Sequence, residues 1–160
     1  MGPFSFFKPK FALSPMAGAD AAAVAAIHKT GFAHSWSARE IADMLAAPAN
    51  FGDVAATADR KKIGGFILSS LAADEAEILA IAVDPRYRGQ GLGKMLMRRN
   101  LARAKAAGAA AMFLEVDKSN AAAIALYRGF GFQNVGERKG YYRRPDGGSA
   151  TALIMRASLG

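Results

Sequence analysis

The 160-residue sequence contains no cysteine, a single tryptophan and only two histidines. The absence of cysteine excludes a disulfide scaffold, a thiolate metal site and a cysteine nucleophile, and it is typical of a reducing, cytoplasmic compartment. The two histidines, His28 and His34, do not make a convincing metal site by themselves, so we expect no metal. No run of about 18 apolar residues is free of charge, so we also expect no membrane-spanning helix.

The N-terminal residues do not read as a cleavable leader. Lys8 and Lys10 precede an apolar stretch, but Pro9 and Pro15 interrupt it and Asp20 follows. We therefore expect an extended arm over residues 1–14 and one domain over residues 15–160. The length agrees, because single domains commonly span about 100–200 residues.

Basic residues outnumber acidic ones by 21 to 13, which gives a formal charge of +8. Such an excess is compatible with nucleic acid, an anionic membrane or an anionic small ligand. The basic residues fall in three separate groups, over 60–62, 86–103 and 138–144. The middle group surrounds a glycine-rich turn, which favours the phosphates of a small ligand, and we expect no direct contact with nucleic acid.

Apolar periodicity predicts a mixed α/β domain. We expect strands over 11–14, 53–58, 63–71, 77–83, 112–116, 132–138 and 151–156, and helices over 18–29, 37–45, 91–107 and 119–128. Ser37 and Glu40 have the spacing of a capping box, and Asn50 and Gly52 are expected in the turn after that helix. A strand, a helix and a strand in the middle of this order predict one βαβ crossover.

The most informative stretch runs from a buried strand ending at Val83, through glycines at 89, 91 and 93, into a helix. Glycines allow close approach of the backbone to a ligand, and a helix N-terminus favours anions. A dinucleotide-binding fold would require G-x-G-x-x-G directly after the strand. Here the spacing is G-x-G-x-G, and five residues separate the glycines from the strand, so a pyrophosphate cradle of another kind is the better interpretation.

The segment V-D-P-R-Y-R-G-Q-G-L-G-K-M-L, residues 83–96, resembles the acetyl-CoA-binding signature of the GNAT superfamily of N-acetyltransferases, in which Arg88, Gly91 and Gly93 match R/Q-x-x-G-x-G/A. The segment L-E-V-D-K-S-N-A-A-A-I-A-L-Y-R-G-F-G-F, residues 114–132, is similar to the RimI branch of that superfamily, the ribosomal-protein alanine N-acetyltransferases. The resemblance implies the acyl-CoA N-acyltransferase fold, whose mostly antiparallel sheet is splayed at the cofactor site.

The resemblance also implies acetyl-CoA as cosubstrate. The strand backbone would pair with the pantetheine arm, a backbone N–H near Val83 would support the oxyanion, and the glycine turn would hold the pyrophosphate. The cofactor-binding residues implied in this way are Ile81, Ala82, Val83, Arg88, Gly89, Gln90, Gly91, Leu92, Gly93, Lys94 and Asn120.

Two residues receive catalytic roles from the resemblance, Glu115 as general base and Tyr127 as the acid that protonates the CoA thiolate. Their alternatives are a carboxylate on the outer face of a half-buried strand and a core tyrosine. Strand alternation puts Glu115 on the face opposite Leu114 and Val116. Asn120, seven residues before Tyr127, lies on the same helix face and is also an N-cap candidate.

Tyr141 and Tyr142 resemble the paired tyrosines that line the acceptor slot, and packing or surface placement is their alternative. Trp36 is expected to anchor the core, with a place on the other side of the slot as its alternative. The resemblance implies a protein N-terminal amine as acceptor, that of a ribosomal protein beginning with alanine. A small-molecule amine, a lysine side chain and a non-catalytic acetyl-CoA-binding module stay open as alternatives. The stretch 147–151 lacks the carboxylate that related enzymes carry before the last strand, which bears on the choice of acceptor.

Overall fold

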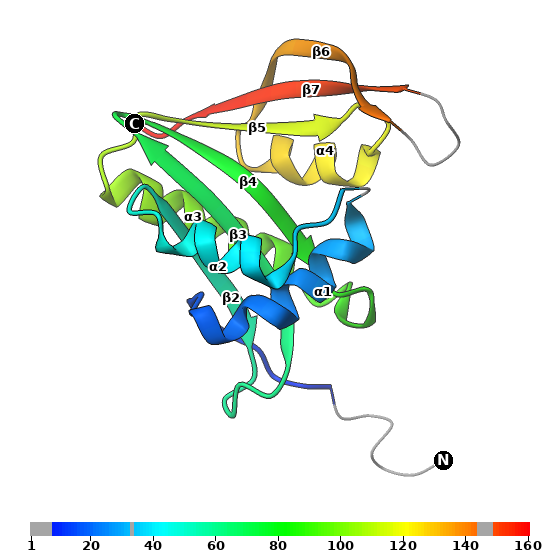
Figure 1. Cartoon of the computed structure of the whole chain (residues 1–160). Coiled ribbons are helices and arrows are strands. Elements are labelled where there is room, and N and C mark those ends of the chain that lie inside the picture. The colour runs from blue at the N-terminus through cyan, green and yellow to red at the C-terminus, as the bar shows by residue number, and fades with distance from the viewer. Residues whose placement is uncertain (1–7, 33, 144–148) are drawn as a thin grey trace.

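The computed structural model describes residues 8–32, 34–143 and 149–160, which form one seven-stranded sheet with helices on both faces (Figure 1). The elements in chain order are β1 (Ala12–Pro15), α1 (Ala21–Gly31), α2 (Ala38–Ala46), β2 (Asn50–Ala56), β3 (Ile63–Ala72), β4 (Glu75–Val83), α3 (Leu92–Ala106), β5 (Ala111–Asp117), α4 (Ala121–Gly129), β6 (Gln133–Arg143) and β7 (Ser149–Ser158). Short 3-10 turns cover Gly18–Asp20 and Pro85–Tyr87. Of the helices described, none is long and apolar enough to cross a membrane.

The strand order is β1-β2-β3-β4-β5-β7-β6. Every neighbouring pair is antiparallel except β4 and β5, which run parallel because α3 connects them as a crossover. The mixed α/β class, the mostly antiparallel sheet and the single central βαβ unit are thereby confirmed.

The parallel pair opens after only three residue pairs. Within the described chain, Glu75–Glu77 pair with residues 111–113, and no further β4–β5 pair follows. On the other side of β4, Leu68 pairs with Ala80 and Ser69 with Ile78, so Leu79 is an extra residue in β4. A β-bulge of this kind bends a strand and increases its twist. The bulge lies directly beyond the last β4–β5 pair, which is where the two strands separate.

Two apolar cores hold the sheet from its two faces. On one face, Leu96 and Met97 of α3 and Ile124 of α4 pack with Met112 and Leu114 of β5. On the other face, α1 and α2 cover the β2–β4 part of the sheet (Figure 1). The largest fully buried side chains include Phe66, Phe132 and Ile41, and several alanines are buried beside them.

Most predicted elements are found within a few residues of their expected ends. The capping box is confirmed, since Ser37 Oγ accepts a bond from the Glu40 N–H at 3.1 Å and Glu40 Oε1 accepts one from the Ser37 N–H at 3.2 Å. Asn50 and Gly52 were wrongly placed in a turn and belong to β2. Gly52 suits this strand because a Cβ there would lie 2.9 Å from the Ile67 carbonyl oxygen. The expected arm over 1–14 contributes its last residues to β1.

A stack of three aromatic rings fixes the end of α1 against the segment before α2. The buried His28 ring lies between Phe32, at a centroid distance of 4.2 Å, and Trp36, at 4.3 Å. His28 Nδ1 accepts a hydrogen bond from the Trp36 backbone N–H at 3.1 Å. Trp36 therefore anchors the core, as expected. Burial lowers the pKa of His28 below 6.5, and the negative charge of Glu40 offsets part of this shift.

Replacing His28 with phenylalanine tests this stack. A histidine whose pKa is lowered on folding stabilises the protein above its unfolded-state pKa, and this contribution is lost as the pH falls. The wild type should therefore lose unfolding free energy between pH 7.5 and pH 5.5, and His28→Phe should lose less. Urea unfolding at several pH values measures the difference. Equal pH dependence of the two proteins would contradict the account.

Candidate active site

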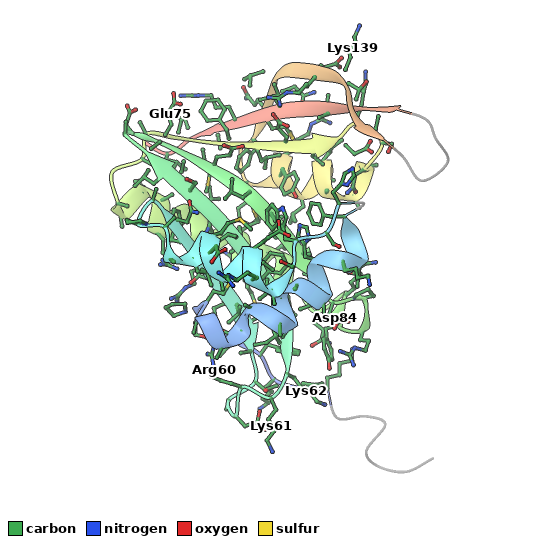
Figure 2. All side chains as sticks on the ribbon, in the orientation of Figure 1. Arg60, Lys61, Lys62, Glu75, Asp84 and Lys139 are labelled. Carbon is green, nitrogen blue, oxygen red and sulfur yellow. The ribbon has the colours of Figure 1, made fainter. Side chains whose placement is uncertain are left out.

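The opening between β4 and β5 forms a cavity of about 600 Å³. Residues 78–83 of β4 and 114–117 of β5 form its walls, and the end of α1 over residues 29–32 closes part of its rim. Figure 2 marks the two ends of β4 by Glu75, its first residue, and by Asp84, which follows its last. Because the β4 backbone faces an opening here instead of a strand, it presents hydrogen-bonding groups to whatever enters.

A short turn connects β4 to α3 below this cavity. Asp84 accepts bonds from the Arg86 backbone and guanidinium, with Nη2 at 2.9 Å from Oδ2. The hydrogen bond from the Arg86 side chain, against a smaller opposing effect of burial, lowers the pKa of Asp84. Arg86 is thus held in the turn, whereas Arg88 lines the cavity.

The glycines complete this turn in a conformation that other residues rarely adopt. Gly89 has φ +83° and Gly91 has φ +78°. Gly91 is the N-cap of α3, and among the described residues no side chain caps the helix there. The first N–H groups of a helix have no partner inside it, so the start of α3 is suited to an anion such as a pyrophosphate. The Leu92 side chain is buried next to Tyr87, which leaves its backbone as the part of this residue that could contact a ligand.

The structure brings seven of the fifteen predicted site residues to one cavity. Its lining includes Ile81, Ala82, Val83, Arg88, Glu115, Asn120 and Tyr127. The predicted residues 89–94 lie in the adjoining turn and at the start of α3 and are not part of the lining. Sequence reasoning missed the end of α1, where Lys29 and Phe32 belong to the lining, because no local signal links that helix end to the glycine turn.

Glu115 lies where two cavities adjoin. Alternation along β5 buries Leu114 and Val116 in the core and puts Glu115 on the other face, as predicted. Its side chain is 19% exposed and forms an ion pair with Arg138 of β6, with Nη2 at 2.8 Å from Oε1. Besides the large cavity, Glu115 lines a second one of about 300 Å³, to which Arg138 also belongs. Apart from the basic character of residues 138–144, no pattern in the sequence predicts this ion pair.

Asn120 and Tyr127 come from opposite ends of α4. Asn120 is the N-cap, and its Oδ1 accepts a bond from the Ala123 N–H at 3.2 Å, which confirms the expected capping. Tyr127 is 8% exposed, and its ring lies edge-on to Phe132 at a centroid distance of 6.1 Å. Asn120 is therefore a helix cap and Tyr127 a core residue. Both also line the cavity that contains Glu115.

Tyr141 and Tyr142 belong to the end of β6, where Tyr142 pairs with Ala150 of β7. The contacts predicted for their side chains lie outside the described part of the structure.

Two of the three basic groups of the sequence are far apart in the structure. Lys61, on the β2–β3 hairpin, and Lys139, on β6, lie at opposite ends of the molecule (Figure 2).

Comparison with protein families finds a match between residues 21–132 and the acetyltransferase (GNAT) family. A curated relative from Escherichia coli strain K12, a [ribosomal protein bS18]-alanine N-acetyltransferase, is 43% identical over 94 residues, which are 59% of this chain and 63% of that protein. The protein of the same description from Haemophilus influenzae is 38% identical over 101 residues, 63% of this chain and 68% of its own length. The sequence match thus covers less than two thirds of the first of these relatives.

Solved structures extend the similarity over nearly the whole chain. The crystal structure of the ribosomal-protein-S18-alanine N-acetyltransferase from Escherichia coli superimposes with a TM-score of 0.85 at 31% identity, covering 94% of each chain. Ard1 from Thermoplasma volcanium superimposes with a TM-score of 0.82 at 26% identity, covering 93% of this chain and 97% of that one.

Proposed function

The chain belongs to the acetyltransferase (GNAT) family, and on that premise we propose that it transfers the acetyl group of acetyl-CoA to the α-amine of a protein N-terminus. The observation that carries the proposal is the convergence of Glu115, Asn120 and Tyr127 on the cavity between the separated strands β4 and β5. A carboxylate and a phenol at one opening supply a proton acceptor and a proton donor, which an amine acylation requires.

The cavity and the turn beneath it fit acetyl-CoA, which would supply the activated acetyl group. The opening leaves the backbone of Ile81, Ala82 and Val83 available for an extended pantetheine arm. The turn over residues 89–94 offers uncapped N–H groups and positive-φ glycines to a pyrophosphate, and Arg88 adds a full positive charge. Asn120, at the start of α4, would contact the same ligand from the β5 side.

Glu115 would act as the general base. An N-terminal amine has a pKa of about 7.7–8.0, so a carboxylate can accept its proton, directly or through one water molecule, near neutral pH. A backbone N–H near Val83 would support the negative charge that develops on the acetyl oxygen. The chain has no cysteine, so the transfer that we propose, directly from cosubstrate to amine, needs no acyl-cysteine intermediate.

Tyr127 would act as the general acid. An unperturbed phenol has a pKa of about 10, so it donates a proton to a departing thiolate more readily than it removes one from an amine. Its burial in the wall of the cavity keeps the hydroxyl at a defined place. Tyr141 and Tyr142 are proposed to line the path of the acceptor.

The acceptor we propose is the N-terminal alanine of a ribosomal protein. This rests on the descriptions of the relatives from Escherichia coli and Haemophilus influenzae, which name ribosomal protein bS18 and alanine. Residues 147–151 contain no carboxylate, so an assay of this acceptor also includes lysine and small amines.

Arg88→Ala tests the cosubstrate site, with Arg86→Ala as its matched control. Arg88 lines the cavity, whereas Arg86 is paired with Asp84. Charge-assisted contacts to phosphate are strong, so Arg88→Ala should weaken acetyl-CoA binding about tenfold. Arg86→Ala should change the Kd less than about threefold, since its guanidinium is held outside the cavity. Isothermal calorimetry measures both, and equal losses would contradict the placement of the phosphates.

Glu115→Gln and Tyr127→Phe test the two catalytic roles. Each removes one proton-transfer group and nearly preserves shape, so each should lower kcat by about 100-fold while acetyl-CoA still binds. Release of free CoA is measured with N-terminal peptides beginning with alanine or serine, and with lysine and small-amine acceptors. Turnover confined to lysine or small amines would contradict the N-terminal acceptor. Unchanged kcat in both variants would contradict the roles.

A further inference from the structure

We propose that Arg138 is a positioning residue, which holds the Glu115 carboxylate at the junction of the two cavities so that it can act as a base. The inference rests on the proposed function, because it concerns the group that would accept the amine proton. It starts from one ion pair, Arg138 Nη2 to Glu115 Oε1 at 2.8 Å.

Strand register puts the two side chains within reach of each other. Asp117 of β5 pairs with Ala152 of β7, and Ala152 pairs with Arg138 of β6, so these three residues form one row on one face of the sheet. Glu115 lies one row away on the same face, because alternate residues of a strand point to the same side. The Arg138 side chain reaches back across β7 to the Glu115 row.

The exposed fractions of Arg138 and Glu115 indicate that their ion pair positions the carboxylate and adds little to the stability of the fold. The Arg138 side chain is 50% exposed, and an ion pair with such a partner contributes little to folding, because water screens it. The Glu115 side chain is only 19% exposed and lines both cavities, whereas Arg138 lines the smaller one alone. The contact therefore constrains a carboxylate that is largely enclosed, from the side away from the proposed cosubstrate site.

Restricting the carboxylate has a consequence for proton transfer. A glutamate side chain rotates about three bonds, and a base must be within hydrogen-bond reach of the proton that it accepts. With Oε1 held by Arg138, Oε2 would be the oxygen that accepts the proton of the incoming amine or of its bridging water. Without Arg138 the carboxylate would sample other rotamers, and fewer acetyl-CoA complexes would be ready to react.

A double-mutant cycle tests the proposal with the wild type, Arg138→Gln, Glu115→Gln and the double variant. In the wild-type background Arg138→Gln should lower kcat about tenfold with little change in the KM for acetyl-CoA. In the Glu115→Gln background the same substitution should change kcat less than about twofold, because its target is gone. Arg138→Lys should recover most of the activity, since an ammonium also pairs with a carboxylate.

Arg156→Gln is the matched control, because Arg156 of β7 lies over Phe113 on the same face of the sheet and its guanidinium engages that ring. It should leave kcat within about twofold of the wild type. If the wild type is active, an equal loss of kcat from Arg138→Gln in both backgrounds would overturn the positioning role. So would an unchanged kcat in the wild-type background. A wild type that acetylates no amine would overturn the proposed function and the positioning role together.

Discussion

The early end of the β4–β5 pairing is the constraint on which the rest of the site depends. After Glu77 and Phe113 the two strands separate, and the extra residue Leu79 bends β4 at that point. The separation opens the cavity, exposes the β4 backbone and sets Glu115 and Tyr127 around one space. A fully paired sheet would occupy the same positions with strand-to-strand hydrogen bonds and leave no room for a ligand.

Local signals in the sequence predicted the parts of the site that are adjacent in the chain. The glycine turn follows from residues 88–94, and the helix after it follows from the apolar spacing over 91–107. Alternation along β5 was enough to assign the face of Glu115. The Ser37–Glu40 capping box was likewise recognisable from spacing. The splay of the strands and the roles proposed for Asn120 and Tyr127 came from the family resemblance and not from residue spacing.

Contacts between segments that are distant in the chain could not be predicted from local sequence patterns. Arg138 meets Glu115 only because β7 inserts between β5 and β6, an order that no local pattern encodes. Phe32 reaches the cavity because the His28 stack holds the end of α1 there. Gly52 was assigned to a turn because glycine commonly marks one, whereas its close approach to the Ile67 carbonyl suits a strand.

Amide hydrogen exchange with and without acetyl-CoA tests the central claim most directly, because a ligand that binds the folded state slows the opening of the segments that it contacts. We predict slower exchange over residues 78–83 of β4 and over the turn at 88–94, with the β2–β3 hairpin at 57–62 unchanged. Unchanged exchange in both of the first two segments, or protection confined to the hairpin, would contradict the account.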